Sequence, residues 1–399
     1  MQFEIDQEVL AKAVGSTMGA VDKRSQALPI LAHCLVKVGD DGLVISATDL
    51  EIQGKGIFPA EVNEEGVFTV HAPILHALVK DLPPGVLTVY QEEGPNHNGG
   101  WVRLEAGTSR YRFPTLNPEH FPPLREIEET SLVEVDAKAL VEMIDKTVFS
   151  ASPTSISHIN SVLWETEDRE GGPYLRLVST DGHRLSVAER PLAGLEGLNL
   201  GEGLLVPLKA IKVIRKFLAD RSGNGKVKLG VIAQEGDNAI NTLCFKDGSQ
   251  EMAVRLLSGN FPDYRKIPQE FKVSFGFQRQ ELMAVLKRLS LLSTDKFRGI
   301  ILQLPLSGEE AEVTHENPDV GNGREVLKML KVELLGNDQE DNQRTETLNI
   351  GFNARYLLDP LAAMTGETVV MAVNEPDRPI RLTDPSDPDT FFLIMPLSL

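Results

Sequence analysis

The chain repeats one structural plan six times: a short alternating strand, a capping or turn residue, and a single amphipathic helix. The starts of these segments lie 65 to 75 residues apart along the 399 residues. Asp6 and Asp136 stand where helix N-caps are expected, and Pro73 and Pro207 stand near first helical turns. Such a period indicates a fold assembled from similar units. The six segments begin at Phe3, Phe68, Val133, Leu204, Val273 and Leu348.

A longer period, close to twice the first, is laid over this plan. The connector HFPPLREI matches NFPDYRKI, and Phe121 and Phe261 within them are 140 residues apart. The short motifs ATDLE, STDGH and VTHEN recur 132 to 134 residues apart, starting at 47, 179 and 313. We therefore predict an α+β fold of three similar domains, each with two β-rich half-units and one helix per half-unit. The predicted domains are 1–122, 123–260 and 261–399.

Alternating apolar runs predict the strands. These runs cover 42–47, 174–179, 226–233, 368–373 and 390–397. Residues 305–347 interrupt the third domain with polar and acidic sequence, and we expect solvated loops there around one strand, VLKMLKVELL.

Composition limits the class of protein. A hydrophobic share of 41% with 25% charged residues is typical of a globular chain. Apolar runs of about 18 residues, which would predict a membrane span, are absent. The N-terminal sequence lacks the basic and then apolar pattern of an export signal, so we expect a cytoplasmic protein. Its two cysteines cannot build a disulfide framework or a cysteine zinc site.

Sequence motifs for catalysis are lacking. The chain has no P-loop, dinucleotide fingerprint, HExxH or GxSxG, and its eight histidines are scattered. We therefore expect no metal and no cofactor. Residues 179–184, STDGHR, form the most reactive-looking string. Because neighbours on a strand point to opposite faces, the string favours a turn with an exposed backbone over a catalytic triad.

Charge placement bears on nucleic-acid binding. The formal net charge of −18 argues against a simple nucleic-acid binder. However, the six predicted helices together carry +5, and the rest of the chain carries −23. On the fourth helix, Lys209, Lys212 and Lys216 fall within about 60° of one another, opposite an apolar face. A solvated helix face explains this stripe, and so does a surface that meets phosphates without reading sequence.

Simple geometry favours a ring of six domains. A domain of about 133 residues has a diameter of roughly 36 Å when treated as a sphere. Three such spheres leave a hole of only about 5 Å, whereas six leave one of about 36 Å. Duplex DNA is about 20 Å across and passes only through the larger hole. A head-to-tail dimer of a three-domain chain could therefore enclose DNA.

The whole chain resembles the bacterial β sliding clamp, the processivity subunit of DNA polymerase III. The resemblance rests on ATDLE, STDGHRL, NFPDYRKIP, STDKFRGIIL, IGFNARYLLDPL and the terminal FFLIMPLSL. It implies a non-catalytic homodimeric ring of six alike domains, with helices lining the channel around double-stranded DNA. The partners that it implies are the polymerase III alpha subunit, the clamp loader, and other polymerases and repair proteins that carry clamp-binding peptides.

The resemblance also implies three sets of site residues. The peptide-binding pocket would be formed by Ile159, Thr180, Gly182, His183, Arg184, Leu185, Pro262, Lys266, Ile267, Met395, Pro396 and Leu397. DNA contacts would come from Arg24, Lys209, Lys212, Arg215, Lys216, Lys287 and Arg288. The dimer interface would use Tyr111, Phe113, Leu291 and Leu292.

Some positions depart from the family pattern. Lys266 stands where arginine is common, and Ser398 stands where a basic residue is common. The loop at 150–157, which often contacts DNA through aromatic or amide side chains, is SASPTSIS here. Two other functions stay open on the residues alone. One is an enzyme that uses the Ser, Asp and His of 179–183, and the other is an acidic repeat scaffold that binds only proteins.

Overall fold

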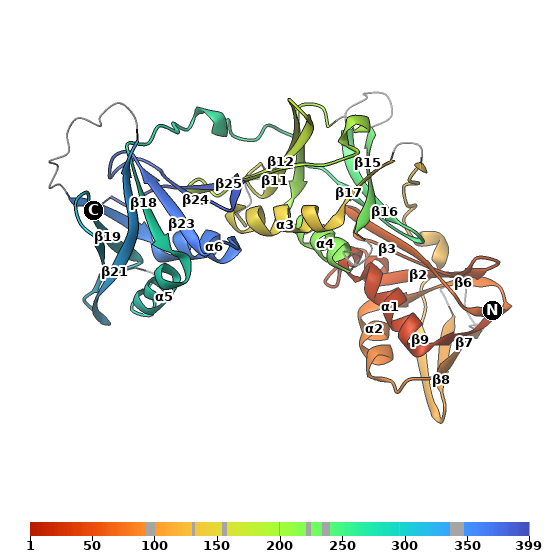
Figure 1. Ribbon diagram of the computed structural model, residues 1–399. Helices are drawn as coiled ribbons and strands as arrows, with labels where there is room; N and C mark the ends of the chain where they lie inside the picture. The colour runs from red at the N-terminus through yellow and green to blue at the C-terminus, as the bar shows by residue number, and fades with distance from the viewer. Residues whose placement is uncertain are drawn as a thin grey trace. The chain divides into compact units, whose positions relative to one another are not determined.

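The computed structural model forms two compact units, and each is described by itself (Figure 1). It describes the chain apart from residues 93–99, 130–131, 154–157, 199, 221–224, 234–239, 295, 336–346 and 399. Unit 1 comprises Met1–Lys138, Ala193–Leu200 and Lys212–Leu256. Unit 2 comprises Ala139–Leu192, Gly201–Ile211 and Leu257–Leu399.

All six predicted helices are confirmed, and each begins directly after a strand. The predicted cap at Asp6 is also confirmed, because its Oδ1 accepts a hydrogen bond from the Glu8 N–H at 2.8 Å. The repeated strand–helix plan is therefore real at every copy. The helices are α1 (Gln7–Thr17), α2 (Ala72–Asp81), α3 (Ala137–Thr147), α4 (Leu208–Ala219), α5 (Arg279–Ser290) and α6 (Ala354–Ala363).

Unit 1 holds two antiparallel sheets. The first, in spatial order, contains β5 (Glu61–Glu64), β1 (Gln2–Asp6), β7 (Val86–Glu92), β8 (Trp101–Ala106) and β9 (Ser109–Pro114). The second contains β10 (Leu132–Asp136), β15 (Lys226–Ala233), β16 (Ile240–Asp247), β17 (Gln250–Arg255), β4 (Ile52–Phe58), β3 (Gly42–Thr48), β2 (His33–Gly39) and β6 (Gly66–His71).

Unit 2 holds one long sheet, against which α5 and α6 lie side by side (Figure 1). Phe275, Phe352 and Leu357 are fully buried where these helices meet the strands. In spatial order the strands are β14 (Leu204–Pro207), β11 (Ser161–Arg169), β12 (Gly172–Thr180), β13 (Arg184–Pro191), β25 (Asp387–Ile394), β24 (Ile380–Asp384), β23 (Thr368–Val373), β18 (Val273–Gln278), β21 (Gly321–Leu334), β20 (Glu310–Asn317), β19 (Gly299–Pro305) and β22 (Thr347–Asn353).

The motifs ATDLE and STDGH are each followed by a strand, and the two strands are paired in equivalent ways. β4 follows ATDLE and pairs with β17, while β13 follows STDGH and pairs with β25. At the head of each pair one main-chain bond recurs. The Arg255 N–H donates to the Glu51 carbonyl at 2.7 Å, and the Met395 N–H donates to the His183 carbonyl at 2.8 Å. Both sheets thus run on across the predicted domain boundaries, and the bounds 1–122, 123–260 and 261–399 stay a prediction.

The expectation of solvated loops around one strand in 305–347 is wrong for most of that segment. Residues 310–317 form β20, and the predicted strand is the later part of the longer β21. Val313, Leu327 and Met329 bury one face of this hairpin, while charged residues and the exposed Val326 and Leu330 occupy the other face. Alternation within an acidic segment therefore built a half-buried strand pair. Residues 336–346 lie outside the described residues.

The last predicted strand, 390–397, is also corrected. β25 ends at Ile394, and Met395 to Leu397 continue without strand structure apart from one bridge between Leu397 and Gly351. Pro396 has no N–H to donate to a ladder, which accounts for the early end of the strand. Among the described residues, no helix is both long enough and apolar enough to cross a membrane.

The buried His33 makes the stability of unit 1 depend on pH. It is buried at the start of β2 and faces His71, with ring centroids 5.7 Å apart. Burial, and then the nearby His71, lower the pKa of His33 to about 4. As the pH falls, His33 is therefore protonated in the unfolded chain before it is protonated in the folded one. The free energy of unfolding is unaffected by this group above about pH 6.5 and decreases as the pH drops toward 4. The full loss is about 3 kcal/mol, at ~1.4 kcal/mol per pH unit.

Urea unfolding at pH 7, 5.5 and 4 measures this loss. The His33→Gln variant, which does not titrate at this position, should lose less stability than wild type over the same range. Equal losses in the two proteins would contradict the assignment to His33.

Candidate functional site

A tight turn opens the candidate site in unit 2. Thr180 Oγ1 accepts from the Gly182 N–H at 3.1 Å and donates to the Arg184 carbonyl at 2.7 Å. Asp181 Oδ1 accepts from the N–H groups of His183 and Arg184, both at 3.0 Å. Gly182 has φ +86°, and a Cβ placed there would meet no atom within 4 Å. The predicted exposed turn is thereby confirmed, with open space above its glycine.

The chain's C-terminal segment crosses beside this turn. The Met395 N–H donates to the His183 carbonyl, and the Leu397 N–H donates to the Gly351 carbonyl, both at 2.8 Å. These two bonds hold the segment while its apolar side chains stay outside the core: Met395 is 41% exposed and Leu397 is 40% exposed. Exposed methionine and leucine on a fixed backbone suit the capture of apolar side chains.

The connector Phe261–Ile267 packs beside the turn. Ile267 packs against the apolar cluster that contains the buried Leu185, so these two predicted residues meet in one core. Pro262 is exposed, and the Lys266 side chain is 83% exposed and pairs with Asp263 at 3.1 Å. We name the surface formed by the turn 180–185, the connector 261–267 and the tail 395–397 the tail groove.

Arg184, which the resemblance places in the peptide-binding pocket, makes contacts within the protein. Its side chain is buried and fully engaged. The guanidinium donates to Asp181 Oδ2 at 3.0 Å, to Asp359 Oδ2 at 2.6 Å and to the Phe149 carbonyl at 2.6 Å. It also lies over the Tyr356 ring, 4.9 Å from the centroid. Arg184 therefore fastens β13 to α6 rather than offering its charge to a ligand.

Sequence reasoning missed the two α6 residues in this arrangement. Tyr356 stacks on the exposed His183 ring, with centroids 5.9 Å apart and planes 16° apart, and Asp359 neutralises Arg184. Both belong to IGFNARYLLDPL, so the motif carried a signal that was not assigned to the site. Ile159 is half-buried, and its carbonyl accepts from the Ser152 N–H at 2.9 Å.

The string 179–184 does not form a catalytic triad. Ser179 Oγ donates to the Thr147 carbonyl, and the Asp181 carboxylate is occupied by the turn and by Arg184. The His183 ring faces Tyr356 instead of either residue. In the part of the chain that the structure describes, no three His, Cys, Asp or Glu side chains gather as metal ligands.

Unit 1 contains a basic cavity of about 270 Å³. It lies between the end of α1, strands β4 and β17, and α4, and we name it the basic cavity. Its charged lining residues are Lys23, Lys55, Lys212 and Lys216, with Asp220 and Glu251, the last of which pairs with Lys55 at 3.3 Å. Gly19 allows α4 to approach, because a Cβ there would lie 2.4 Å from Val213 Cγ1. Burial, then Lys216, Lys80 and Lys23, lower the pKa of His76. Lys216, Lys80 and Lys23 therefore lie close enough to His76 to form one positive region around it. The sequence analysis did not single out Lys23 or Lys80.

The predicted DNA-contacting side chains are exposed, as a phosphate-facing surface requires. Lys209, Lys212 and Lys216 project from α4 opposite the buried Ile211, Ile214 and Leu218, as the helical spacing indicated. Arg24, Arg215 and Lys287 are exposed as well. Arg288 is exposed but donates to Glu325 at 2.8 Å, which offsets its charge. Residues 154–157 of the loop 150–157 lie outside the described residues.

Among the strand edges with unpaired main-chain groups in the described residues, two concern the predicted dimer interface, β9 and part of β21. β9 ends its sheet and pairs only with β8. β21 pairs with β20 along Gly321–Lys328, whereas β18 takes up its other side only from Met329 onward. Apolar residues beside the second edge are exposed: Leu291 by 80% and Val326 by 55%. Open edges with apolar neighbours are a common means of chain association.

The residues predicted for a dimer interface divide between surface and core. Phe113 of β9 is buried within its own unit, and Tyr111 is half-buried. Leu292 is half-buried, and its Cδ1 would lie 3.0 Å from a Cβ placed on Gly323. Leu291 alone of the four is strongly exposed.

Family models match the chain in three consecutive blocks. They are the N-terminal, central and C-terminal domains of the DNA polymerase III beta subunit, matched at residues 1–125, 134–263 and 264–398. The chain belongs to the DNA polymerase III beta subunit family. This family is one of sliding clamps, which are processivity factors and not enzymes, and the fold is that of three DNA-clamp domains.

Similar proteins align with this chain over their whole lengths. The beta sliding clamp of Caulobacter vibrioides strain NA1000 is 29% identical over 399 residues, and that of Escherichia coli K12 is 28% identical over 403 residues. Each alignment covers 100% of both chains. A crystal structure of the C. crescentus beta sliding clamp matches with a TM-score of 0.88 at 28% identity, covering 100% of this chain and 99% of that one.

Proposed function

We propose that two copies of this chain close head to tail into a ring around double-stranded DNA. The observation that carries this proposal is the open Gly321–Lys328 edge of β21 with exposed Leu291 and Val326, together with a second open edge at β9, in a family of sliding clamps. Joining β9 of one copy to β21 of the other would continue a sheet and cover Leu291 and Val326. The resulting ring tethers the replicative polymerase to its template.

Loading onto a primed circular template tests this function. A cognate clamp loader should place the protein on the circle, and cutting the circle should release it. Retention on the linear product, or no retention on the circle, would contradict an encircling ring. The second outcome would favour an acidic scaffold that binds only proteins.

The DNA-facing surface is proposed to be the α4 lysines with the basic cavity. Changing Lys209, Lys212 and Lys216 to Ala should flatten the salt dependence of residual DNA binding. Each lost phosphate contact lowers the slope of log affinity against log salt by about 0.9, so the slope should fall by up to about 3. Fluorescence anisotropy with a short duplex at several salt concentrations measures it.

A matched control removes the same charge elsewhere in the sequence. Lys37, Lys226 and Lys228 are exposed on sheet strands, and their Ala variant should keep the wild-type slope. Equal slopes in all three proteins would reduce the α4 stripe to a solvated face.

The tail groove is proposed to dock short peptides of the polymerase III alpha subunit, of the clamp loader, and of other polymerases and repair proteins. The resemblance to sliding clamps implies a peptide with a glutamine and two apolar anchors, and Met395, Leu397 and Ile267 offer apolar contacts to those anchors beside an exposed turn. Central apolar contacts usually carry most of the binding energy, and rim charges such as Lys266 carry little.

A further inference from the structure

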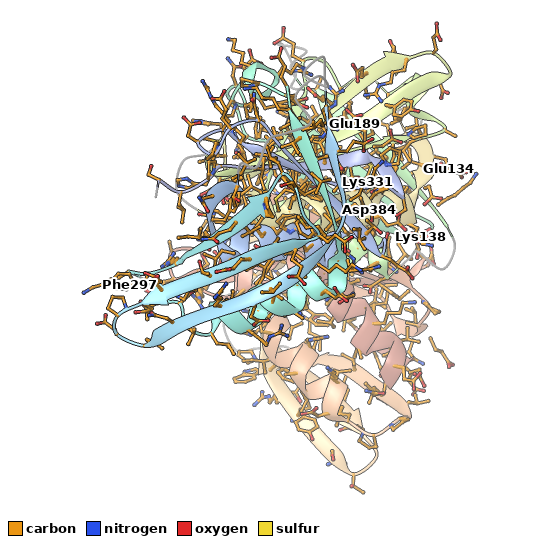
Figure 2. The ribbon with its side chains drawn as sticks, turned by 60° about the vertical axis from the view of Figure 1, so that its left-hand side comes forward. Glu134, Lys138, Glu189, Phe297, Lys331 and Asp384 are labelled. Carbon is orange, nitrogen blue, oxygen red and sulfur yellow. The ribbon has the colours of Figure 1, made fainter. Side chains whose placement is uncertain are left out.

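A row of charged side chains crosses three strands of unit 2 beside the tail groove. Glu165 on β11 stands opposite Arg176 on β12, which stands opposite Glu189 on β13. Arg176 donates to Glu165 Oε1 at 3.2 Å and to Glu189 Oε1. Glu189 is labelled in Figure 2. Paired charges on adjacent strands form a ladder that holds each side chain in a defined place.

The connector of the tail groove is attached to one end of this row. The Tyr264 hydroxyl donates to Glu165 Oε1, and Arg265 Nη2 donates to the same oxygen at 2.7 Å. Arg176 Nη1 donates to the Tyr264 hydroxyl at 3.3 Å. Glu165 thus accepts from two connector residues and from its own ladder partner. Among the described residues, Tyr264 and Arg265 make every side-chain hydrogen bond from segment 261–267 to the sheet.

This attachment reaches the groove through a single turn of backbone. Tyr264–Lys266 is a 3₁₀ turn, and the Ile267 N–H donates to the Tyr264 carbonyl at 3.1 Å. The Tyr264 ring is buried in the same apolar cluster as Leu185. A shift of Tyr264 on the sheet therefore moves Ile267, one wall of the groove.

The matching connector in unit 1 is held differently. Arg125 occupies the position that Arg265 has in the repeat, and it donates to Asn241 Oδ1 at 2.7 Å and to Thr242 Oγ1 at 2.8 Å. Gln53 bonds the Arg125 main chain at both N–H and carbonyl. These acceptors are neutral, so the carboxylate anchor is a feature of the connector that borders the tail groove.

We propose that Glu165 is a positioning residue for the tail groove. It fixes Tyr264 and Arg265 from the sheet and thereby sets the place of Ile267 without belonging to the groove itself. A nearly buried carboxylate with three donors makes strong, directional contacts, which suits it to holding a wall that a peptide must fit. The proposal rests on the tail groove being a peptide-docking site.

The test compares two variants with the same chemical change. Glu165→Gln removes the charge beneath the connector. Glu167→Gln removes an equal charge that bonds Arg169 and Arg176 but neither connector residue. The probe is a fluorescein-labelled synthetic peptide with one glutamine and two leucine anchors, titrated into the full-length protein. Glu165→Gln should weaken binding about tenfold, the scale of one hydrogen bond to a charged group, and Glu167→Gln less than about twofold.

A second measurement needs no peptide. Hydrogen exchange of the Lys266 and Ile267 amides should quicken about tenfold in Glu165→Gln and stay at the wild-type rate in Glu167→Gln. A general loss of stability would instead quicken exchange throughout unit 2. If Glu165→Gln fails to fold, Tyr264→Phe removes only the hydroxyl and should give the same two effects.

The outcomes separate this inference from the docking proposal. Wild-type affinity and exchange in Glu165→Gln, with Met395→Ala still weakening the peptide, would overturn the positioning role alone. Equal weakening in both glutamate variants would also overturn it, because the ladder would then act only on general stability. A wild-type protein that does not bind the probe at all would overturn the docking proposal, and the positioning role with it.

Discussion

Removal of Met395–Leu399 should abolish peptide and polymerase binding while leaving the protein dimeric. The deletion takes away two exposed apolar side chains and the segment that is bonded to the His183 and Gly351 carbonyls. We expect a loss of affinity of at least about 30-fold, because two apolar anchors contribute about 1–3 kcal/mol each and 1.4 kcal/mol is tenfold. Titration of a labelled polymerase peptide measures the loss, and light scattering checks the dimer.

Two point variants refine this result. Met395→Ala should weaken the peptide by about 1–3 kcal/mol through lost side-chain burial. Ser398→Ala lies in the same exposed tail but removes no apolar contact, so it serves as the matched control. Wild-type affinity in both the deletion and Met395→Ala, with folding intact, would mean that the docking site lies elsewhere.

The double variant Leu291→Ala with Val326→Ala should shift the protein from dimer to monomer. Each side chain is at least half exposed in the single chain. Val326 lies in the open part of β21, and Leu291 directly precedes Leu292, which lies by Gly323 in that part. Their burial against a second copy is worth about 2 kcal/mol per side chain, and each residue occurs at both interfaces of a two-subunit ring. Light scattering from nanomolar to micromolar concentration should show an 88 kDa species only for wild type, about twice the 43.8 kDa chain.

The control for this variant changes equally exposed apolar residues away from β9 and β21. Ile74 on α2 is 55% exposed and Val86 on β7 is 62% exposed, and their Ala variant should stay dimeric. A monomeric wild type at every concentration would contradict the closed ring. Leu292 is left unchanged, because its packing near Gly323 would mix a folding defect with an interface defect.

The helices and the exposed turn could be predicted from sequence because their signals are local. Lys209, Lys212 and Lys216 recur at helical spacing, and an Asp-Gly pair before alternating residues predicts a turn into a strand. Both were confirmed. The peptide-pocket residues came from the resemblance, and the structure brings Leu185 and Ile267 into one cluster.

The misses have one physical cause, which is that the deciding partner lies far along the chain. From sequence alone Arg184 is a cation without an assigned partner. In the structure it bonds Asp359, which lies 175 residues later in the chain. In sequence the β20–β21 pair resembles an acidic loop, because its buried residues alternate with charges and are covered only once helix α5 packs against the two strands. Glu165 and Tyr264 are likewise 99 residues apart.

The continuous sheets across the repeats decide where such a ring can yield. Within each copy, β4 is joined to β17 and β13 to β25 by ladders of main-chain hydrogen bonds that must be pulled apart together. A junction between copies would rest on one added pair of short edges and a few apolar side chains. Under tension the strand pairings within each copy therefore resist separation, and the contact between the two copies gives way first. A protein that opens the ring therefore has to separate only β9 of one copy from β21 of the other, and the rest of each subunit can stay folded.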